Sequence, residues 1–522
     1  MNKAKERSPG VGRLLGAVVL AAATWALLPA RAQEAPPADP PADPTTQPAQ
    51  SPATQDEPKP IRPTVPPPKD ESPKEEVKIT PRQAEELFHS VDEILEFDSK
   101  QTGLRIKKDV KRKLTSRDEV VSYLTKHVND EDTKRLRRSE LVLKKFGLLP
   151  REFNLETFLV ALLREEVAGY YDPKTKTVNL LDWVPIAEQE PVMAHELTHA
   201  LQDQAIGLQK WMKKGAKDLG ELSKDPTPAD IENDEMDNAR EAVIEGQAQA
   251  MMFQYAMAPT GHSIANSPAL MDAMEQETLT GTPSTKVFND APIFMKESLT
   301  FPYSYGMEFV VKLMQQGGKE KAFAAVLKNP PHTTRQIMEP ETYLSAEKIE
   351  PMRVPDFKHD FKDYEKFDIG AMGEFDVAVL IEQYAGKPSS KHLYPEWRGG
   401  YYYAAKRKPD PKAGSAGTAP LGLLYVSRWS SATKAAEFAE IYARALKQRY
   451  QKAEEAGDPN SDQAAQKVDS ADLRNGRHAW TTEEGAVVIE ERGDTVLVSE
   501  GLDAETTATL EREVFGAPSV AK

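Results

Sequence analysis

The segment at residues 191–207, PVMAHELTHALQDQAIG, constrains the structure of this chain more than any other segment. Pro191 suits the first turn of a helix and Gly207 suits a helix C-terminal cap, so we expect one helix between them. His195 and His199 then project from one face, because side chains four residues apart lie above one another on a helix. Two imidazoles so placed can bind one metal ion, and Glu196 beside them suits a general base for metal-assisted hydrolysis.

The composition limits which side chains can complete this metal site. The chain has 522 residues and no cysteine, which excludes thiolate ligands, disulfides and thiol nucleophiles. Any metal ion must therefore be held by histidine and carboxylate side chains. The net charge of −15 argues against a nucleic-acid partner, because phosphate binding needs a basic surface. We interpret the basic run at residues 107–113 as a solvated helix face, since acidic residues surround it.

The N-terminal segment has the features of an export signal. Basic residues within the first thirteen positions precede an apolar run at residues 14–28 and an Ala-Arg-Ala sequence ending at Ala32. We expect a signal peptide over residues 1–32, which makes the protein exported, periplasmic or extracellular. The apolar run is shorter than the roughly 20 residues that a membrane-spanning helix needs, so we expect no stable membrane span after cleavage.

The next segment, residues 33–80, is rich in proline and almost free of large apolar side chains. Such a composition cannot bury enough surface to offset the conformational entropy of the chain. We expect a disordered linker here, with ordered structure beginning at Thr80 and Pro81, a typical N-cap and first helical residue.

The rest of the chain changes its hydrophobic pattern along its length. Residues 81–163 show helical periodicity, and residues 169–181 place aromatic and β-branched residues around an Asp-Pro-Lys-Thr turn, which predicts a hairpin. Later strands and helices do not alternate regularly, which is typical of an α+β unit. We therefore expect an α+β protein with a mainly helical, metal-binding part at residues 81–354 and a smaller α+β domain with an antiparallel sheet at residues 355–522.

A zinc site of this kind normally has a third protein ligand. Metzincins place Gly and then His or Asp where this chain has Gln202 and Ala205, so that class is excluded. A helical pattern from Asp237 onward carries Glu241 and Glu245, which lie four residues apart on one face. Either carboxylate can be the third ligand on this pattern alone.

The residue after the second carboxylate favours Glu245. Glycine inside a helix costs about 1 kcal/mol relative to alanine, so Gly246 indicates a close approach to another backbone.

Two elements resemble the gluzincin zinc metallopeptidases. HELTH at residues 195–199 is similar to their HExxH helix, and Glu245-Gly-Gln-Ala resembles the E-G-x-A element of gluzincins related to the neutral aminopeptidases. In the alternative, residues 241–245 resemble the E-x-x-x-D element of thermolysin-like enzymes, with Glu241 as the ligand and Glu245 orienting a histidine. Residues 330–343 (PPHTTRQIMEPETY) resemble a segment of exported bacterial peptidase-MA-like proteins of unassigned substrate.

The resemblance implies a set of roles and a fold. One Zn²⁺ ion would be bound by His195, His199 and Glu245, and Glu196 would activate its water. A small mixed sheet would precede the active helix, and an edge strand of that sheet, residues 177–181 or a neighbour, would pair with an extended peptide substrate.

A further group is expected to stabilise the oxyanion formed by water attack on an amide. Tyr303-x-x-Gly306 resembles the Tyr-x-x-Gly element whose tyrosine has this role in aminopeptidase-like gluzincins, and Tyr303 is the first candidate. Tyr305 is the second candidate, and His332 is a third possible donor. Core packing of the tyrosines and a turn at His332 are the alternatives without catalytic roles.

Together these patterns predict an exported zinc-dependent peptidase that acts on a peptide or protein substrate. The alternative is a catalytically silent, exported, metal-containing binding or scaffold protein that uses residues 355–522 as its interaction module.

Overall fold

The computed structural model describes residues 78–120, 130–166, 169–184, 186–213, 231, 235–266, 286–408, 420–456 and 476–516. The expected signal peptide at residues 1–32 and nearly all of the expected linker at residues 33–80 lie outside the described residues. The first described helix, α2 (Pro81–Thr102), begins as expected: the Thr80 hydroxyl accepts a hydrogen bond from Gln83 N, and the Gln83 side chain accepts one from Thr80 N.

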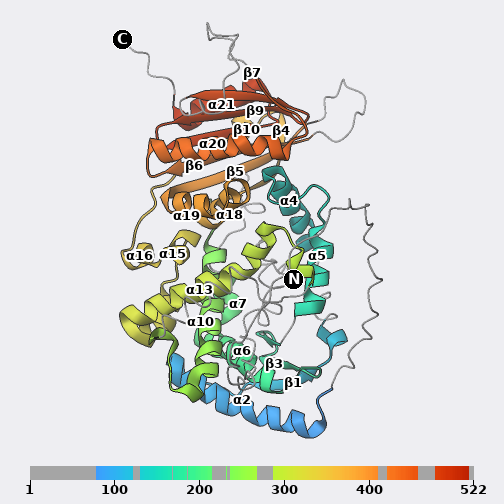
Figure 1. The fold of residues 1–522 in the computed structure, drawn as a ribbon, viewed down its shortest axis with the longest axis vertical. Helices are drawn as coiled ribbons and strands as arrows, with labels where there is room; N and C mark the ends of the chain where they lie inside the picture. The colour runs from blue at the N-terminus through green and yellow to red at the C-terminus, as the bar shows by residue number, and fades with distance from the viewer. Residues whose placement is uncertain are drawn as a thin grey trace, which may run out of the picture.

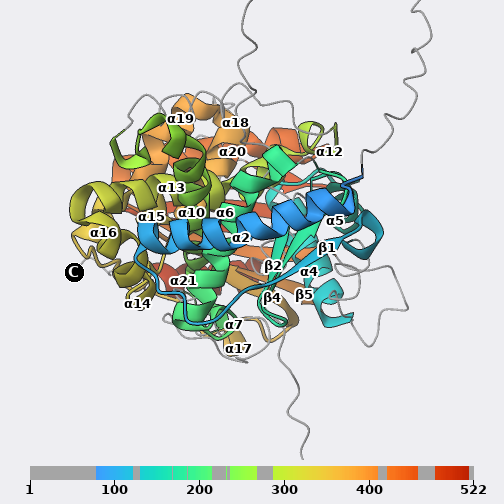
Figure 2. The ribbon, with the colours of Figure 1, turned by 90° about the horizontal axis from the view of Figure 1, so that it is seen from below.

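The molecule is arranged along its long axis in three parts (Figure 1). A three-stranded sheet and α2 lie at one end, a group of helices lies in the middle, and a seven-stranded sheet lies at the other end. The two longest helices of the middle part are α10 (Met236–Met257) and α13 (Ile293–Lys319). The α2 helix crosses its end of the molecule and packs on α6 (Ile186–Ile206), as Figure 2 shows from below.

The small sheet is mixed, as expected. Its strand order is β1 (Lys111–Thr115), β3 (Thr177–Leu181), β2 (Tyr170–Asp172); β1 runs parallel to β3, and β2 is antiparallel to it in the predicted hairpin. Strand β3 is therefore paired on both sides and cannot take up a substrate strand, which excludes residues 177–181 and leaves a neighbouring strand, the other possibility, for that part. Strand β2 is an edge of this sheet among the described residues.

Strand β1 also corrects the interpretation of the basic run at residues 107–113. Its residues alternate between exposed and partly buried before Thr115, which is buried. The Arg112 guanidinium reaches back to the Asp92 carboxylate on α2, at 2.8 Å and 3.0 Å. Backbone pairing with β3 gives this charged stretch an extended conformation, which its side chains alone do not indicate.

The remaining elements of the first 354 residues are helical. They are α4 (Asp130–Phe146), α5 (Leu155–Glu166), α7 (Leu208–Lys213), η2 (Ala258–Thr260), η3 (Ile264–Asn266), α12 (Lys286–Asn289), the π-helical turn η4 (Glu320–Ala325), α14 (Val326–Lys328), α15 (Thr334–Met338) and α16 (Pro340–Leu344). Regular helix geometry in α13 is interrupted at Gly317 and Gly318, directly before η4. Among the described helices, none combines the length and the apolar character that crossing a bilayer requires.

The large sheet is antiparallel throughout, as expected. In spatial order its strands are β4 (Tyr364–Ala371), β5 (Trp397–Arg407), β6 (Leu421–Trp429), β10 (Thr495–Glu500), β9 (Gly485–Arg492), β8 (Arg477–Thr482) and β7 (Ala453–Ala456). Its helices are α17 (Phe357–Asp360), α18 (Glu374–Ala385), α19 (Lys387–Leu393), η5 (Tyr394–Glu396), α20 (Ala432–Arg449) and α21 (Ala504–Phe515). The α+β class is confirmed.

The two faces of the large sheet are covered by different helices, because successive side chains of a strand point to opposite faces. Tyr425 packs against Phe438 of α20, while Leu424 and Leu497 share a cluster with α21 and with Phe357 of α17.

The helical part and the large sheet are joined through the end of α4. The Phe146 ring packs edge-on against Tyr425 and Tyr402, with ring centroids 5.4 Å and 5.8 Å apart, and one hydrophobic cluster extends from α2 to β10. The division into domains after residue 354 stays a prediction.

Candidate metal centre

The predicted histidine pair lies on α6, which begins earlier than expected. The helix starts at Ile186, so Pro191 lies inside it and not at its first turn. The Gln189 side chain bonds the backbone of Leu181 at 2.9 Å and 3.0 Å and that of Val184 at 2.6 Å, which anchors the first turns of α6 to the end of β3. Gly207 ends the helix as predicted, with a left-handed φ of 68° and its N–H bonded to Asp203 O.

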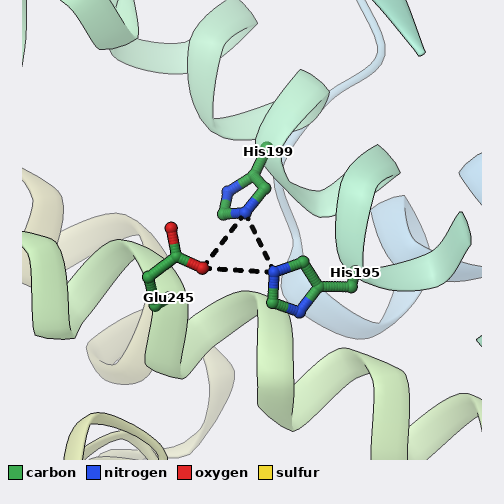
Figure 3. A group of neighbouring side chains, drawn as sticks. All are labelled: His195, His199 and Glu245. Carbon is green, nitrogen blue, oxygen red and sulfur yellow. Dashed lines mark hydrogen bonds and ion pairs between the residues drawn. The ribbon is translucent and has the colours of Figure 1, made fainter. Parts of the chain in front are cut away.

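His195, His199 and Glu245 meet at one point, where α6 packs against α10 (Figure 3). The Nε2 atoms of the two histidines are 3.1 Å apart, and Glu245 Oε2 lies 3.2 Å from His195 Nε2 and 3.4 Å from His199 Nε2. All three side chains are buried, with exposed fractions of 0%, 0% and 1%. The third member of this group, and its only carboxylate, is Glu245, as Gly246 indicated.

These distances fit a tetrahedral zinc site. Zinc–nitrogen and zinc–oxygen bonds of about 2.0–2.1 Å place tetrahedral ligand atoms roughly 3.3–3.4 Å apart. The three observed separations span 3.1–3.4 Å, so an ion at normal bond lengths fits between them with little movement of the side chains. No fourth His, Asp or Glu joins the group among the described residues, which leaves one position for water or substrate.

The charges of the group are mutually compensated. Burial alone would raise the pKa of Glu245, but the neighbouring imidazoles outweigh it and hold that pKa below its ordinary value. Burial would lower the pKa of His199, and the Glu245 carboxylate raises it instead. Burial lowers the pKa of His195. The carboxylate is therefore ionised and available as a ligand.

A chain of amide hydrogen bonds orients His199. Its Nδ1 donates to Gln202 Oε1 at 2.9 Å, and the Gln202 amide nitrogen donates to Ile244 O at 3.0 Å and to Gln247 Oε1 at 2.9 Å. Gln247 in turn donates to the backbone oxygens of Ala322 and Phe323 in η4. Because Gln202 Nε2 has two acceptors, its Oε1 faces His199, which places the proton on Nδ1 and frees Nε2 for a metal ion.

Glu196 lies next to the group without joining it. Its Oε2 accepts a hydrogen bond from the backbone N–H of Tyr171 on β2 at 2.7 Å, and its Oε1 is fully buried with no hydrogen-bond partner. Burial raises the pKa of Glu196 to about 7. Tyr171 is held in turn by its own hydroxyl, which donates to Asp203 on α6 at 2.8 Å. The edge strand β2 thus positions this carboxylate.

Tyr303 is brought to the centre from α13. Its ring stacks on the His195 ring with centroids 6.0 Å apart, and its side chain is 1% exposed. Burial raises the pKa of Tyr303, and the carboxylates of Glu245, Glu241 and Glu196 raise it further. The phenol therefore keeps its proton beside the Glu245 carboxylate.

The other candidate residues lie outside the metal-binding group. Glu241 is one helical turn from Glu245 and 8% exposed, and burial together with the Glu245 charge raises its pKa. Tyr305 points elsewhere: its ring packs on Phe301, and apart from burial the pKa of Tyr305 is raised by Tyr394 and nearby acids. Glu241, the alternative third ligand, is therefore not part of the metal-binding group, and Tyr305, the second candidate for the oxyanion donor, does not face it.

The contacts of His332 also lie outside the metal-binding group. His332 is exposed, its backbone N–H donates to Gln336, and partial burial and the charge of Arg240 lower its pKa. With Glu235, Arg335 and Trp397 it lines a cavity of about 540 Å³ between the helical part and β5. Neither the three ligand residues nor Glu196 lines that cavity, so His332 does not serve as an oxyanion donor in this arrangement.

Our reading of the sequence missed the residues that support the ligands. Tyr171, Gln202 and Gln247 contact the group or its neighbours. All three lie in predicted elements, but none of them was predicted to support a ligand. Helical spacing could have found Gln202, which is three residues from His199 and shares its face, whereas Gln247 is only two residues from Glu245 and carried no such signal.

Comparisons with protein-family models, with curated proteins and with solved structures found no match to this chain. Fold and site therefore rest on the residues and their geometry, which support a buried His195-His199-Glu245 group that could hold a metal ion.

Proposed function

We propose that this protein is an exported zinc-dependent peptidase of the gluzincin type. The observation that carries the proposal is the combination of three convergent ligand atoms with a separate carboxylate, Glu196, whose Oε1 is unpartnered beside them. A structural zinc site would have four protein ligands and no such carboxylate. Zinc bound by these ligands would supply a Lewis acid that acidifies water and polarises a carbonyl.

The protein's own groups then have defined tasks. Glu196 takes the proton of the attacking water at Oε1 and passes it to the leaving amine, while the Tyr171 N–H holds Oε2 in place. The Tyr303 hydroxyl donates to the oxyanion that develops on the substrate. A peptide added along the free edge of β2 would run past Glu196, because Tyr171 donates its N–H on that edge.

The test is the substitution Glu196→Gln. Proteolysis of an unbiased peptide library by the wild type should be inhibited by phenanthroline. The Gln variant should keep its zinc by elemental analysis and lose activity by about 10²–10⁴-fold or more, the range for a general base. Glu190→Gln is a matched control on the same helix, partly buried and bonded to Ser90 Oγ. Proteolysis that survives in E196Q would contradict the mechanism.

A second candidate is a catalytically silent metal-containing scaffold protein. The observation that favours it is burial, since the exposed fraction of His195, Glu196, His199, Glu245 and Tyr303 is at most 1%. Both candidates bind zinc, so only turnover separates them: zinc-loaded wild type without phenanthroline-sensitive hydrolysis supports the scaffold.

Export is tested separately. Mass spectrometry of the mature protein should find Gln33 as its first residue, after cleavage behind Ala32.

A further inference from the structure

Tyr171 contacts helix α6 at two points that lie two turns apart. Its backbone N–H donates to Glu196 Oε2 at 2.7 Å, and its phenol hydroxyl donates to Asp203 Oδ2 at 2.8 Å. Residues seven positions apart lie on nearly the same face of a helix, about 10 Å from each other along its axis. The tyrosine therefore lies along α6 and links the proposed general base to a second carboxylate.

The second carboxylate, Asp203, is buried in a place that does not favour it. Its side chain is 2% exposed and lies in the last turn of α6, where the helix dipole disfavours negative charge. Carboxylates are rarely buried unless donors satisfy them. Here the donors are the Tyr171 hydroxyl, the Lys176 ammonium group and the Leu208 N–H at 3.0 Å. Two of these three come from the β2–β3 hairpin, so Asp203 joins the hairpin to the helix.

The hairpin turn is strained at the other residue that reaches Asp203. Lys176 has a φ of 58°, in the left-handed region that favours glycine. Such conformations persist where surrounding contacts impose them, and the Lys176 side chain crosses to Asp203 on α6. Glycine would relieve the backbone but has no ammonium group. The choice of lysine here indicates that the contact with Asp203 matters more than an unstrained turn.

Strand β2 needs an anchor because it is short and lies directly over the general base. It has three residues, and among the described strands only β3 pairs with it. Just before it, a Cβ atom on Gly169 would lie 3.4 Å from Val192 Cγ1 and 3.9 Å from Glu196 Cγ. A shift of β2 along α6 would therefore take the Tyr171 N–H away from Glu196 Oε2.

We propose that Asp203 is a positioning residue for the general base. By holding the Tyr171 hydroxyl and the Lys176 ammonium group, it fixes the hairpin on α6, so that the Tyr171 N–H holds Oε2 of Glu196 and leaves Oε1 for proton transfer. The inference rests on the proposed function, whose catalytic groups stay the same, and Asp203 acts on them only through Tyr171.

The experiment compares the zinc-loaded, full-length wild type with Tyr171→Phe and Asp203→Asn. Phenylalanine keeps the ring and the backbone N–H, and asparagine keeps the size of the side chain without its charge. In both variants kcat for peptide hydrolysis should fall by about 10–100-fold, the range that a small misplacement of a catalytic group can cost. The KM and the zinc affinity should stay within a few-fold, because neither variant changes a metal ligand.

Hydrogen exchange follows the position of Tyr171 without any turnover. The peptide at residues 169–172 should exchange slowly in the wild type, since the Tyr171 N–H is bonded to a buried carboxylate. In Y171F and D203N its protected amide should exchange at least about 10-fold faster. Lys176→Met should change exchange in the same direction but by less, because the Lys176 side chain is half exposed and only one of the three donors is lost.

Tyr364→Phe is the matched control. The Tyr364 hydroxyl also donates to an aspartate, Asp503 at 2.9 Å, but on the large sheet. This variant should leave kcat and the exchange of residues 169–172 unchanged.

Wild-type kcat and exchange in Y171F and D203N would overturn the inference. An equal loss in Y364F would also overturn it, as would a 10-fold loss of zinc affinity in D203N, because either result would place the effect outside the general base. A wild type that hydrolyses no peptide would overturn the proposed function alone, since hydrogen exchange still shows whether Asp203 holds Tyr171 on Glu196.

Discussion

Gly246 and Gly306 face each other where α10 crosses α13, with no room for a side chain on either. A Cβ atom on Gly246 would lie 2.2 Å from the carbonyl carbon and oxygen of Gly306, and one on Gly306 would lie 2.2 Å from Ala242 O. The close approach indicated by Gly246 is therefore confirmed. It sets the separation of the helices that carry Glu245 and Tyr303, each within one turn of a facing glycine.

Replacing Gly306 with Ala should force these helices apart. Backbone atoms cannot move aside as a flexible side chain can, so we expect a loss of unfolding free energy of about 1–3 kcal/mol or more. Zinc affinity should fall as well, because Glu245 moves with α10. Urea unfolding and chelator competition measure the two effects. Ser304→Ala on the same helix removes only a hydroxyl bonded to Thr300 O and should change neither by much. Wild-type zinc affinity in G306A would contradict this coupling.

The two carboxylates of α10 should differ sharply in their effect on metal binding. Glu245→Gln removes a charged ligand that contacts both histidines at 3.2 Å and 3.4 Å, and we expect zinc affinity to fall by at least about 10²-fold. Glu241→Gln changes a carboxyl outside the metal-binding group and should leave zinc affinity within a few-fold. Isothermal titration of both variants is the measurement. The reverse ranking would make Glu241 the ligand.

Glu235 should make stability depend on pH. This carboxyl accepts hydrogen bonds from Thr334 N and Thr334 Oγ1 at the junction of α10 and α15, and burial raises its pKa to about 7. The folded protein then binds a proton that the unfolded chain releases near pH 4.5, so stability is highest at low pH and falls between about pH 4.5 and 7.

Glu235→Gln cannot ionise and keeps the acceptor oxygen. At pH 8 the variant should be more stable than the wild type by about 3 kcal/mol, and at pH 4 the two should be equal. Urea unfolding at both pH values tests this. Glu341→Gln, whose exposed carboxylate pairs with Lys312, should change stability by less than about 1 kcal/mol at either pH. A difference at pH 4 as large as that at pH 8 would show that ionisation is not the cause.

Arg449 should be the most sensitive charged residue at the junction with the large sheet. It bonds both oxygens of Glu500 at 2.8 Å and 2.9 Å, with side chains only 4% and 0% exposed. Arg449→Met leaves the Glu500 charge buried with Lys145, 3.8 Å away, as its remaining cation, and should cost about 3–5 kcal/mol of unfolding free energy. The double variant R449M/E500Q should recover part of this loss. No recovery would mean that packing and not charge sets the cost.

The sequence pattern alone was sufficient to predict those features that depend on a single helix or hairpin. The four-residue spacing of His195 and His199 places both imidazoles on one face of any helix, whatever surrounds that helix. The same holds for the hairpin at β2 and β3, where turn chemistry and strand composition agree. The parallel pairing of β1 with β3 was missed, because residues 107–113 carry a charge pattern that exposed helices and edge strands share.

The sequence by itself therefore determined the histidine pair, the position of Glu196 beside it and the restriction to histidine and carboxylate ligands. Only the tertiary structure decided that Glu245 and not Glu241 reaches the histidines, and that the amides of Gln202 and Gln247 lie behind His199. The physical reason is that helical periodicity places side chains on a face, whereas the rotation and separation of α6, α10 and α13 depend on how closely their backbones pack. At Gly246 and Gly306 that packing leaves no space for even one more carbon atom.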